Sequence, residues 1–230
     1  MKITFYGHAC LGIQINDIHV LVDPFITGNE KASHIDIDTI QADYILITHA
    51  HQDHILDVEA IAKRTDAIIV SNYEIVTHYQ NLGFNGHPMN HGGSWEFEFG
   101  KLKYVNAIHT SSFPDGSYGG QPGGFVIKTY GEKSKSKSIY IAGDTALTYD
   151  MKLVGRQFDL DIAVLPIGGN FTMDVDDAIT ASKFLDVHRV LGYHYDTFGY
   201  IEIDKVRAKA KFDSKLRTLK LLDIGASMEI

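Results

Sequence analysis

The sequence predicts one α/β domain over residues 1–230, made of two similar halves with mixed sheets inside and helices outside. Short apolar, β-branched runs recur along all 230 residues, helical patterns lie between them, and no Pro-, Ser- or Gly-rich linker separates the two halves. Hydrophobic residues make up 44% and charged residues 22%. These fractions are typical of globular proteins and exclude disorder as the main state.

The first half begins with three expected strands joined by tight turns such as Asn16-Asp17, at residues 3–6, 11–15 and 19–22. The run 44–48 is continuously apolar, which predicts a strand covered on both faces. A helix over 57–63 and a strand over 67–70 follow. Ser71-Asn72 can cap a further helix that runs through Leu82 and ends at Gly83.

The second half repeats this style, with expected strands at 101–108, 124–129, 138–142, 162–165, 190–192 and 219–222. Helices are expected over 175–185, with Asp174 as the cap, and over 205–212. Trp95, Phe97 and Phe99 alternate as in a strand, which favours packing in the core. The Lys- and Ser-rich tract 131–138 is interpreted as a solvated hairpin loop.

The charge balance excludes several classes of protein. Lys plus Arg number 21 and Asp plus Glu 29, so the net charge of −8 disfavours coating nucleic acid or docking on an anionic membrane. No apolar run approaches the ~20 residues of a membrane helix, and the first residues lack a signal-peptide pattern.

One cysteine, Cys10, excludes an intrachain disulfide framework and fits a cytoplasmic location. Any metal must therefore be bound by His and carboxylate.

Histidine is enriched, with 12 residues, and the densest group follows the expected strand 44–48. In His49-Ala50-His51-Gln52-Asp53-His54, four of six residues are metal-ligand types. His49 and His51, two apart in extended chain, can point the same way, while Asp53 and His54 can face a second point nearby. One tetrahedral ion needs about four ligands. The segment therefore supplies half a shell for each of two ions, and the remaining ligands must come from elsewhere.

Three further candidates each follow the end of an expected strand: His109, Asp144 and His194. Open α/β sheets place their sites at such strand ends, so we expect these side chains to gather. Taken singly, a strand-end histidine is usually a surface or hydrogen-bonded residue, and Asp144 fits a turn or helix cap. Together with the dense segment, they indicate a metal centre.

The motif His49-x-His51-x-Asp53-His54, followed by His109, Asp144 and His194, resembles the metallo-β-lactamase superfamily. The resemblance extends from Tyr6-Gly7-His8 to His194 and implies a four-layer αββα sandwich, two mixed sheets flanked by helices. Within the superfamily the chain looks similar to the small metal-dependent hydrolases related to ascorbate-6-phosphate lactonase. The segments 6–10, 22–25 and 166–173 carry that likeness.

The resemblance implies two divalent metal ions per chain, zinc being expected and manganese or iron being alternatives. One ion would take His49, His51 and His109, and the second would take Asp53, His54 and His194. Asp144 would bridge them. Because this position holds Asp and not Cys, the chain resembles the hydrolases that lack a thiolate ligand. His51 argues against the flavodiiron oxygen reductases, which carry an acidic residue there.

The implied activity is hydrolysis of a small ester, lactone or phosphodiester by a hydroxide shared between the ions. Asp53 and Asp144 are the expected catalytic carboxylates: Asp144 fixes the metal separation and Asp53 orients the hydroxide. The resemblance also places His8 and Asp23 near the site. The candidate substrate contacts are His8, Asn170, Thr172 and Tyr195, and for each a structural role competes: hydrogen bonding, turn formation or packing.

Three other functions stay open. The first is an RNA or DNA phosphodiesterase, because some relatives with the same first motif process RNA. The net charge of −8 disfavours a nucleic-acid partner. A non-hydrolytic di-iron redox protein would be supported by a flavin partner or by iron-dependent absorbance. A metal-stabilised interaction module would be stabilised by metal and show no turnover. The expected partner is a small-molecule substrate. No membrane partner is expected, and the formation of a homo-oligomer is left open.

Overall fold

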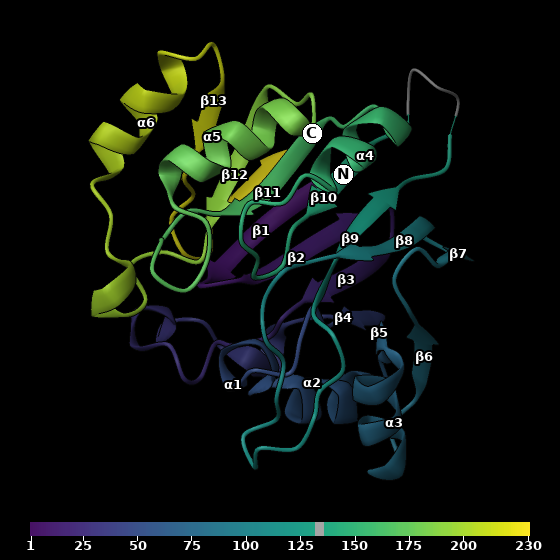
Figure 1. The fold of residues 1–230 in the computed structure, drawn as a ribbon. Coiled ribbons are helices and arrows are strands. Elements are labelled where there is room, and N and C mark those ends of the chain that lie inside the picture. Colours follow the sequence, from purple (N-terminus) through teal and green to yellow (C-terminus); the bar gives the residue numbers. More distant parts are fainter. Residues whose placement is uncertain (132–135) are drawn as a thin grey trace.

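The computed structural model describes residues 1–131 and 136–230. Two seven-stranded sheets pack face to face, and helices cover the outer face of each sheet (Figure 1). Helices α1–α3 lie on one side of the sandwich and α4–α6 on the other. These four layers confirm the αββα architecture that the resemblance implied.

The first sheet has the strand order β14-β1-β2-β3-β4-β5-β6. Its strands are β1 (Lys2–Gly7), β2 (Cys10–Ile15), β3 (Ile18–Val22), β4 (Tyr44–Leu46), β5 (Ile68–Asn72), β6 (Gly86–Met89) and β14 (Ser227–Glu229). Strands β14 to β3 pair antiparallel, and β3 to β6 pair parallel. Its helical elements are η1 (Glu30–Ala32), η2 (Ile37–Thr39), α1 (Gln52–Ile55), α2 (Val58–Thr65) and α3 (Tyr73–Asn81).

The second sheet has the order β13-β12-β11-β10-β9-β8-β7. Its strands are β7 (Ser94–Phe97), β8 (Gly100–Asn106), β9 (Gly123–Lys128), β10 (Ser138–Ile141), β11 (Ile162–Pro166), β12 (Arg189–Tyr193) and β13 (Thr218–Lys220). Its helical elements are α4 (Met151–Gln157), α5 (Val175–Phe184), η3 (Gly199–Ile201) and α6 (Lys205–Asp213). Pairing is antiparallel from β7 to β10 and parallel from β10 to β13, as in the first sheet. The two halves are therefore similar, as predicted.

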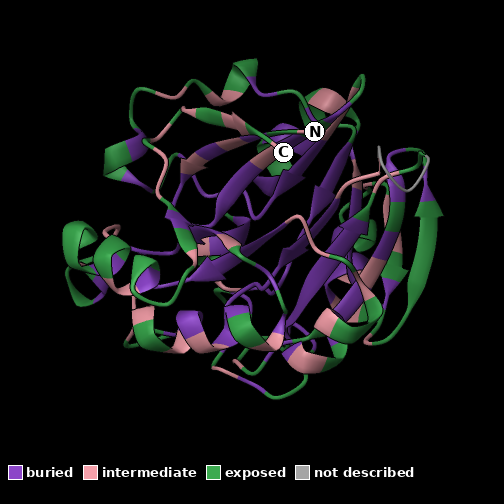
Figure 2. Cartoon of the chain, turned by 90° about the horizontal axis from the view of Figure 1, so that it is seen from above, coloured by how far each residue is buried: buried purple, intermediate pink, exposed green. Residues whose placement is uncertain are grey.

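The apolar strands separate two layers of core because successive side chains point to opposite faces of a sheet. In β10, Ile139 and Ile141 join the core between the sheets, while Tyr140 packs under the helices. Strand β4 does the same: Leu46 faces the inner core and Ile45 the helices. Figure 2 shows most of the strands buried, apart from exposed strands at the sheet edges, and the helices exposing their outer faces. The expectation that the run 44–48 is covered on both faces is confirmed.

Two sequence-based expectations need correction. The strand expected over 44–48 ends at Leu46; Ile47 N–H still donates to Val70 O at 3.0 Å, and the chain bends at Thr48. Trp95 does not pack in the core: it is 54% exposed and lies against the His87 ring at 4.9 Å, whereas Phe97 and Phe99 are buried as expected. The loop expected over 131–138 includes 132–135, which lie outside the described residues.

The helix caps follow the sequence closely. Asp174 accepts hydrogen bonds from the N–H groups of Asp176 and Asp177 at the start of α5, as predicted. Asn72 accepts from Ile75 N–H at the start of α3. In residues 1–131 and 136–230, every helix is too short or too polar to cross a membrane.

Candidate metal centre

The His-rich segment is held rigidly where β4 ends. The Thr48 N–H and hydroxyl donate to the two oxygens of buried Asp23, at 2.8 and 2.6 Å. The chain bends at Thr48, and His51, with an extended backbone, directly precedes the short helix α1 (Gln52–Ile55). His49 and His51 before the helix belong to one group, and Asp53 and His54 in the helix belong to another.

The first group consists of His49, His51 and His109, whose ring nitrogens lie within 4.8 Å of one another. His49 Nε2 and His51 Nδ1 are 3.0 Å apart. The other ring nitrogen of His49, Nδ1, contacts the Thr48 hydroxyl at 3.0 Å. That contact leaves Nε2 facing the group, which is the arrangement expected of a metal-binding imidazole.

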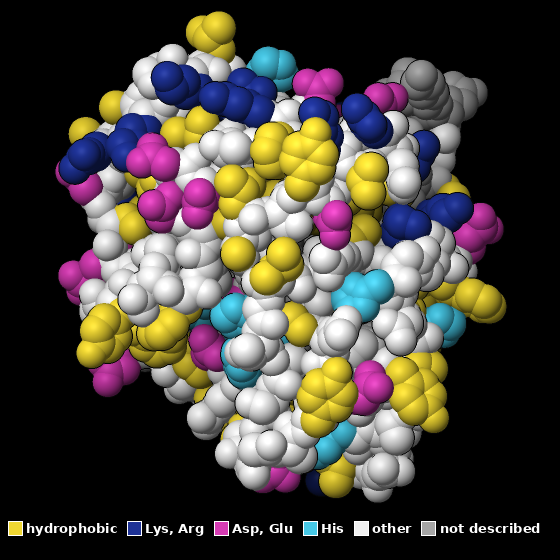
Figure 3. Space-filling view, viewed as in Figure 1, with side chains coloured by type: hydrophobic (Ala, Val, Ile, Leu, Met, Phe, Trp, Pro, Cys, Tyr) yellow, Lys and Arg dark blue, Asp and Glu magenta, His cyan; other side chains and the backbone are white. Residues whose placement is uncertain are grey.

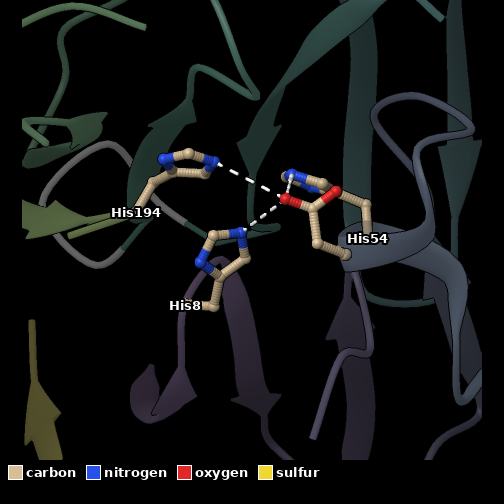
Figure 4. A group of neighbouring side chains, drawn as sticks. His8, His54 and His194 are labelled. Carbon is tan, nitrogen blue, oxygen red and sulfur yellow. Dashed lines mark hydrogen bonds and ion pairs between the residues drawn. The ribbon is translucent and has the colours of Figure 1, made fainter. Parts of the chain in front are cut away.

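The second group consists of His8, Asp53, His54 and His194 (Figure 4). His8 Nε2 lies 3.0 Å from Asp53 Oδ2, and the Nε2 atoms of His54 and His194 each lie 4.0 Å from the same oxygen. On its other side, His54 Nδ1 lies 2.8 Å from Asp23 Oδ2. Asp23 therefore orients His54 so that its Nε2 points into the group.

Asp144 lies between the two groups. Its Oδ2 is 3.0 Å from His194 Nε2, and it lies 3.4, 3.6 and 4.0 Å from the Nε2 atoms of His54, His109 and His49. It follows β10 by way of Gly143, which has a φ of +67°. A Cβ there would lie 2.6 Å from Gly123 O, so only glycine lets the chain turn this close to the neighbouring strand.

The electrostatics of the centre match a cation-binding site. Burial lowers the pKa of His49 well below its ordinary value, and burial beside His194 lowers the pKa of His8 to about 4. Burial opposes ionisation of Asp144, but the neighbouring His194 and His54 hold its pKa well below the usual range. Mostly neutral imidazoles around ionised carboxylates form the donor set that a divalent cation requires.

His54 behaves differently in the metal-free chain. Burial disfavours its charged form, but the carboxylates of Asp144 and Asp23 outweigh burial and raise its pKa well above the ordinary value. A protonated imidazole between two carboxylates supplies the positive charge that a cation would otherwise supply. Metal binding at His54 would therefore release a proton.

Several buried polar atoms of the centre make no well-aligned hydrogen bond within the described part of the chain, although Asp144 Oδ2 lies close to two of them. They are His54 Nε2, Asp144 Oδ1 and both ring nitrogens of His194. Buried polar atoms are normally paired, so four such atoms in one cluster need a common explanation. Imidazole nitrogens and carboxylate oxygens are ligands for divalent transition metals, and the residues present fit such ions.

The backbone of the centre is strained at three non-glycine residues. His8, Asp23 and His194 have φ values of +52°, +44° and +54°. Such conformations cost about 1–3 kcal/mol each and cluster at functional sites. The two strained histidines are joined, because His194 N–H donates to His8 O at 2.8 Å. The fold thus fixes the directions of both imidazoles through the main chain.

A cavity of about 260 Å³ opens onto both groups. Five of the clustered side chains line it: His51, Asp53, His109, Asp144 and His194. The rest of its wall is formed by Thr110, Phe171 and Phe198. A small molecule in this cavity would contact the carboxylates and imidazoles directly.

The structure brings together the seven predicted ligands, and it adds His8 to the second group. It does not bring Asn170, Thr172 or Tyr195 to the cavity wall. Asn170 is exposed in a turn at φ +54°, and the Thr172 hydroxyl lies 3.4 Å from Met173 O. Tyr195 is buried against Phe5 at a ring distance of 6.4 Å and lines a separate cavity of about 130 Å³.

None of those three residues lines this cavity, so substrate contacts at them stay a prediction. Sequence reasoning missed Thr110, Phe171 and Phe198 as cavity residues. Thr110 directly follows His109, and Phe171 lies inside the segment 166–173, so their neighbours offered a weak signal. Phe198 has no motif that distinguishes it from a core phenylalanine.

Comparison with known proteins agrees with this geometry. Residues 2–194 match a family that is described as the beta-lactamase superfamily domain. A UPF0173 metal-dependent hydrolase of Christiangramia forsetii is 67% identical over 231 residues, which is 100% of both chains. A protein of the same description from Flavobacterium johnsoniae is 64% identical over 230 residues, again 100% of both.

Solved structures give the same result. Igni18, a metallo hydrolase from Ignicoccus hospitalis, superposes with a TM-score of 0.87 at 31% identity, covering 100% of this chain and 98% of its own. The metallo-beta-lactamase fold protein YhfI from Bacillus subtilis, at 14% identity, shares the fold with a TM-score of 0.73 over 99% of both chains. The chain therefore belongs to the UPF0173 family of metal-dependent hydrolases, within the beta-lactamase superfamily.

Proposed function

We propose that this hydrolase is dinuclear. One cation is held by His49, His51 and His109, and the second is held by Asp53, His54 and His194, with Asp144 between them. The observation that carries the proposal is the position of Asp144 Oδ2, within 4.0 Å of imidazole nitrogens from both groups. His8 joins the second group as a further candidate ligand, because its Nε2 lies 3.0 Å from Asp53 Oδ2.

Divalent cations bound there would lower the pKa of a water molecule and polarise the carbonyl or phosphoryl oxygen of a substrate. Asp144 is buried and holds the two groups at a fixed separation. The Asp53 side chain is 29% exposed and lines the cavity, so it can accept a hydrogen bond from the attacking water and orient it.

A protein nucleophile is not needed for this reaction. Cys10 is buried. The Ser111 hydroxyl, which follows His109 closely in sequence, donates to Gly119 O at 2.9 Å and accepts from Ala50 N–H at 3.1 Å. Both of its roles are structural, which supports water as the nucleophile.

The cavity of about 260 Å³ supports a small ester, lactone or phosphodiester as the substrate. The likeness to the ascorbate-6-phosphate lactonase branch also favours including lactones. A donor set of imidazoles and carboxylates without thiolate suits zinc, and also manganese or iron. Zinc is the proposed metal because it stands highest of these three in the order of affinity.

The proposal is tested by hydrolysis assays on protein stripped with a chelator and reloaded with Zn²⁺ or Mn²⁺. Dihydrocoumarin and bis(p-nitrophenyl) phosphate serve as a lactone and a phosphodiester. Reloading should restore turnover of at least one of them. His51→Ala and Asp144→Ala should each abolish turnover, while circular dichroism shows that the fold survives.

Matched controls are available on the surface. His34 and Asp159 are exposed and lie outside the cavity wall, so His34→Ala and Asp159→Ala should retain full activity. Unchanged activity in both His51→Ala and Asp144→Ala would reject the proposed mechanism.

A further inference from the structure

The part of the cavity wall that does not belong to the metal centre is largely apolar. It consists of Thr110, Phe171 and Phe198, and no Lys or Arg of the described residues lines the cavity. Phe171 is 52% exposed and Phe198 is 39% exposed. Two phenyl rings are therefore presented to solvent beside the predicted reaction centre rather than packed in the core.

The distribution of side chains on the surface agrees with this division between a polar metal centre and an apolar part of the wall. Figure 3 shows His and acidic side chains together left of the centre of this face, with hydrophobic side chains to their left. Most Lys and Arg side chains of the face lie above this region, toward its upper part. A substrate that enters the cavity thus meets imidazoles, carboxylates and phenyl rings, and no Lys or Arg of the described residues.

Hydrogen bonds fix the backbone that carries Phe171. Gly169 N–H donates to Met173 O at 3.1 Å, and Met173 N–H donates to Thr145 O at 3.0 Å. Thr145 directly follows Asp144, so the turn of Phe171 is tied to the segment that carries the central carboxylate. The ring of Phe171 also lies edge-on to Tyr200 at 6.2 Å.

Phe198 is held from the other side of the centre. Ile201 N–H donates to Phe198 O at 3.0 Å, and Asp196 N–H donates to Ile201 O at 2.8 Å, which closes the turn after His194. The Phe198 ring packs edge-on against His8 at 5.3 Å. Both phenyl groups are therefore built into the site and not carried by unattached loops.

An anionic group on the substrate, apart from the bond that is hydrolysed, would find no Lys or Arg partner among the described residues of the cavity wall. Proteins bind phosphate and carboxylate groups mainly with Arg and Lys, often through paired hydrogen bonds. Without such a partner, an anion would lose hydration against the two phenyl rings, which is unfavourable. An uncharged ring or branched alkyl group would instead bury apolar surface against the same rings.

We propose that the enzyme is selective for neutral esters or lactones whose non-reacting part is an aryl or bulky alkyl group lying against Phe171 and Phe198. This inference rests on the proposed function and specifies its substrate class. In the reaction, the water oxygen bonds to the acyl carbon, the ester C–O bond breaks, and the leaving alkoxide takes up a proton given up by the attacking water, which yields the acid and the alcohol. Substrates that carry an additional phosphate or carboxylate are disfavoured.

Two esters that differ by one charge test this selectivity on the zinc-loaded enzyme. Phenyl acetate is neutral, and 4-acetoxybenzoate carries a ring carboxylate that makes the phenol a better leaving group. Intrinsic reactivity thus favours the charged ester, while the cavity favours the neutral one. We expect kcat/KM to be at least about tenfold higher for phenyl acetate, the factor that one hydrophobic contact can supply. Equal or faster hydrolysis of 4-acetoxybenzoate would overturn the inference.

Variants assign the selectivity to the two rings. Phe171→Ala and Phe198→Ala should each raise KM for phenyl acetate about tenfold, and KM for methyl acetate, which has no ring to lie against them, by a much smaller factor. Leucine at either position should restore part of the affinity. Tyr149 is 65% exposed and lies outside the cavity wall, so it provides a control: Tyr149→Ala should leave the hydrolysis of both substrates unchanged. Equal effects on methyl and phenyl acetate would contradict the role of the rings.

A binding experiment separates this inference from the proposed function. Calorimetry on the zinc-loaded protein compares benzohydroxamate with acetohydroxamate and with 4-carboxybenzohydroxamate. Tightest binding of benzohydroxamate supports the apolar subsite even when no ester is hydrolysed, in which case only the proposed hydrolysis of esters fails. Equal binding of the three hydroxamates would refute the subsite whatever the enzyme hydrolyses.

Discussion

Asp23 is the residue that most determines how the predicted ligands are oriented. It is fully buried and accepts hydrogen bonds from the Thr48 N–H and hydroxyl, while its Oδ2 also contacts His54 Nδ1 at 2.8 Å. Thr48 in turn contacts His49 Nδ1. One carboxylate thus orients a histidine of each metal-binding group, directly for His54 and through Thr48 for His49.

Replacing Asp23 by Asn should therefore weaken metal binding without removing a ligand. The amide keeps an acceptor for Thr48 N–H but loses the charge that orients His54. Changes of this kind typically weaken metal affinity about 10- to 100-fold. Titration of zinc against a competing chromogenic chelator measures the effect. Wild-type affinity in Asp23→Asn would contradict the orienting role.

His8 makes the metal-free protein sensitive to acid. Burial beside His194 lowers its pKa to about 4 in the fold, against an ordinary value of 6.5. Between these two values the unfolded chain binds more protons, so the free energy of unfolding falls as the pH falls from 6.5 to 4. The contribution of one proton is about 1.4 kcal/mol per pH unit.

Urea unfolding of chelator-treated protein at pH 7, 6 and 5 checks this dependence. His8→Asn should show a shallower fall in stability than the wild type, by up to the slope of one proton. The exposed His34 gives the control His34→Asn, which should keep the wild-type slope. Identical slopes in His8→Asn and the wild type would show that His8 is not held neutral by the fold.

The seven metal-ligand candidates could be predicted from sequence because each lies in a dense motif or directly after a strand. The position of Tyr195 could not be predicted in this way, and its contact with substrate stays a prediction, since it lies outside the cavity wall. His194 adopts a left-handed backbone with φ +54°, so the directions of these two neighbouring side chains do not follow from their order in the chain. Tyr195 packs in the helix-side core, while His194 belongs to the metal centre. Sequence spacing alone does not reveal such a turn.

At the level of elements, the start of α3 is connected to the metal-binding segment. The Asn72 side chain accepts from Ile75 N–H at 2.9 Å and donates to Gly119 O and Gln121 O at 2.9 and 3.2 Å. Gly119 O also accepts from Ser111, which contacts Ala50 between His49 and His51. Asn72 thus couples a helix N-terminus to the loop beside the site.

Asn72→Ala should destabilise the fold by about 2–3 kcal/mol, since a helix cap and two hydrogen bonds contribute about 1 kcal/mol each. Asn72→Ser retains a capping oxygen and should lose only the two bonds to the loop. Chemical denaturation of both variants measures the difference. Equal stability losses in the two variants would show that the cap contributes nothing.

The elements that sequence reasoning missed are those in which tertiary packing overrides local preference. Strand β6 contains Gly86 and Pro88, both unfavourable in strands, and lies at the edge of its sheet, where Pro is tolerated. Helix α4 contains Gly155, which lowers helix propensity. A Cβ at Gly155 would lie 2.6 Å from Phe184 O, so the close approach of α4 to α5 requires glycine there. That requirement is visible only in three dimensions.

At the level of the whole molecule, the metal centre joins the two sheets. His8 and the segment 49–54 come from the first sheet, whereas His109, Asp144 and His194 follow β8, β10 and β12 of the second. The repeated order of antiparallel then parallel strands places these strand ends together. Sequence alone predicted the layers, while the order of strands within each sheet followed only from the pairings.

Because cations would connect the two sheets, their removal should lower the thermal stability of the whole molecule. A ligand present at 100 times its Kd stabilises the folded state by about 2.7 kcal/mol. For a chain of this size, that corresponds to a rise in Tm of roughly 5–10 °C. Differential scanning calorimetry before and after zinc reloading measures the shift. A Tm that is independent of zinc would contradict the connecting role.

The central claim is that two cations lie side by side in this centre. Anomalous diffraction from crystals of the zinc-loaded protein, recorded above and below the zinc edge, tests it most directly. We expect two zinc peaks about 3.5–4 Å apart, one beside His49, His51 and His109 and the other beside Asp53, His54 and His194, with Asp144 between them. A single peak, or peaks bound by other residues, would contradict the account.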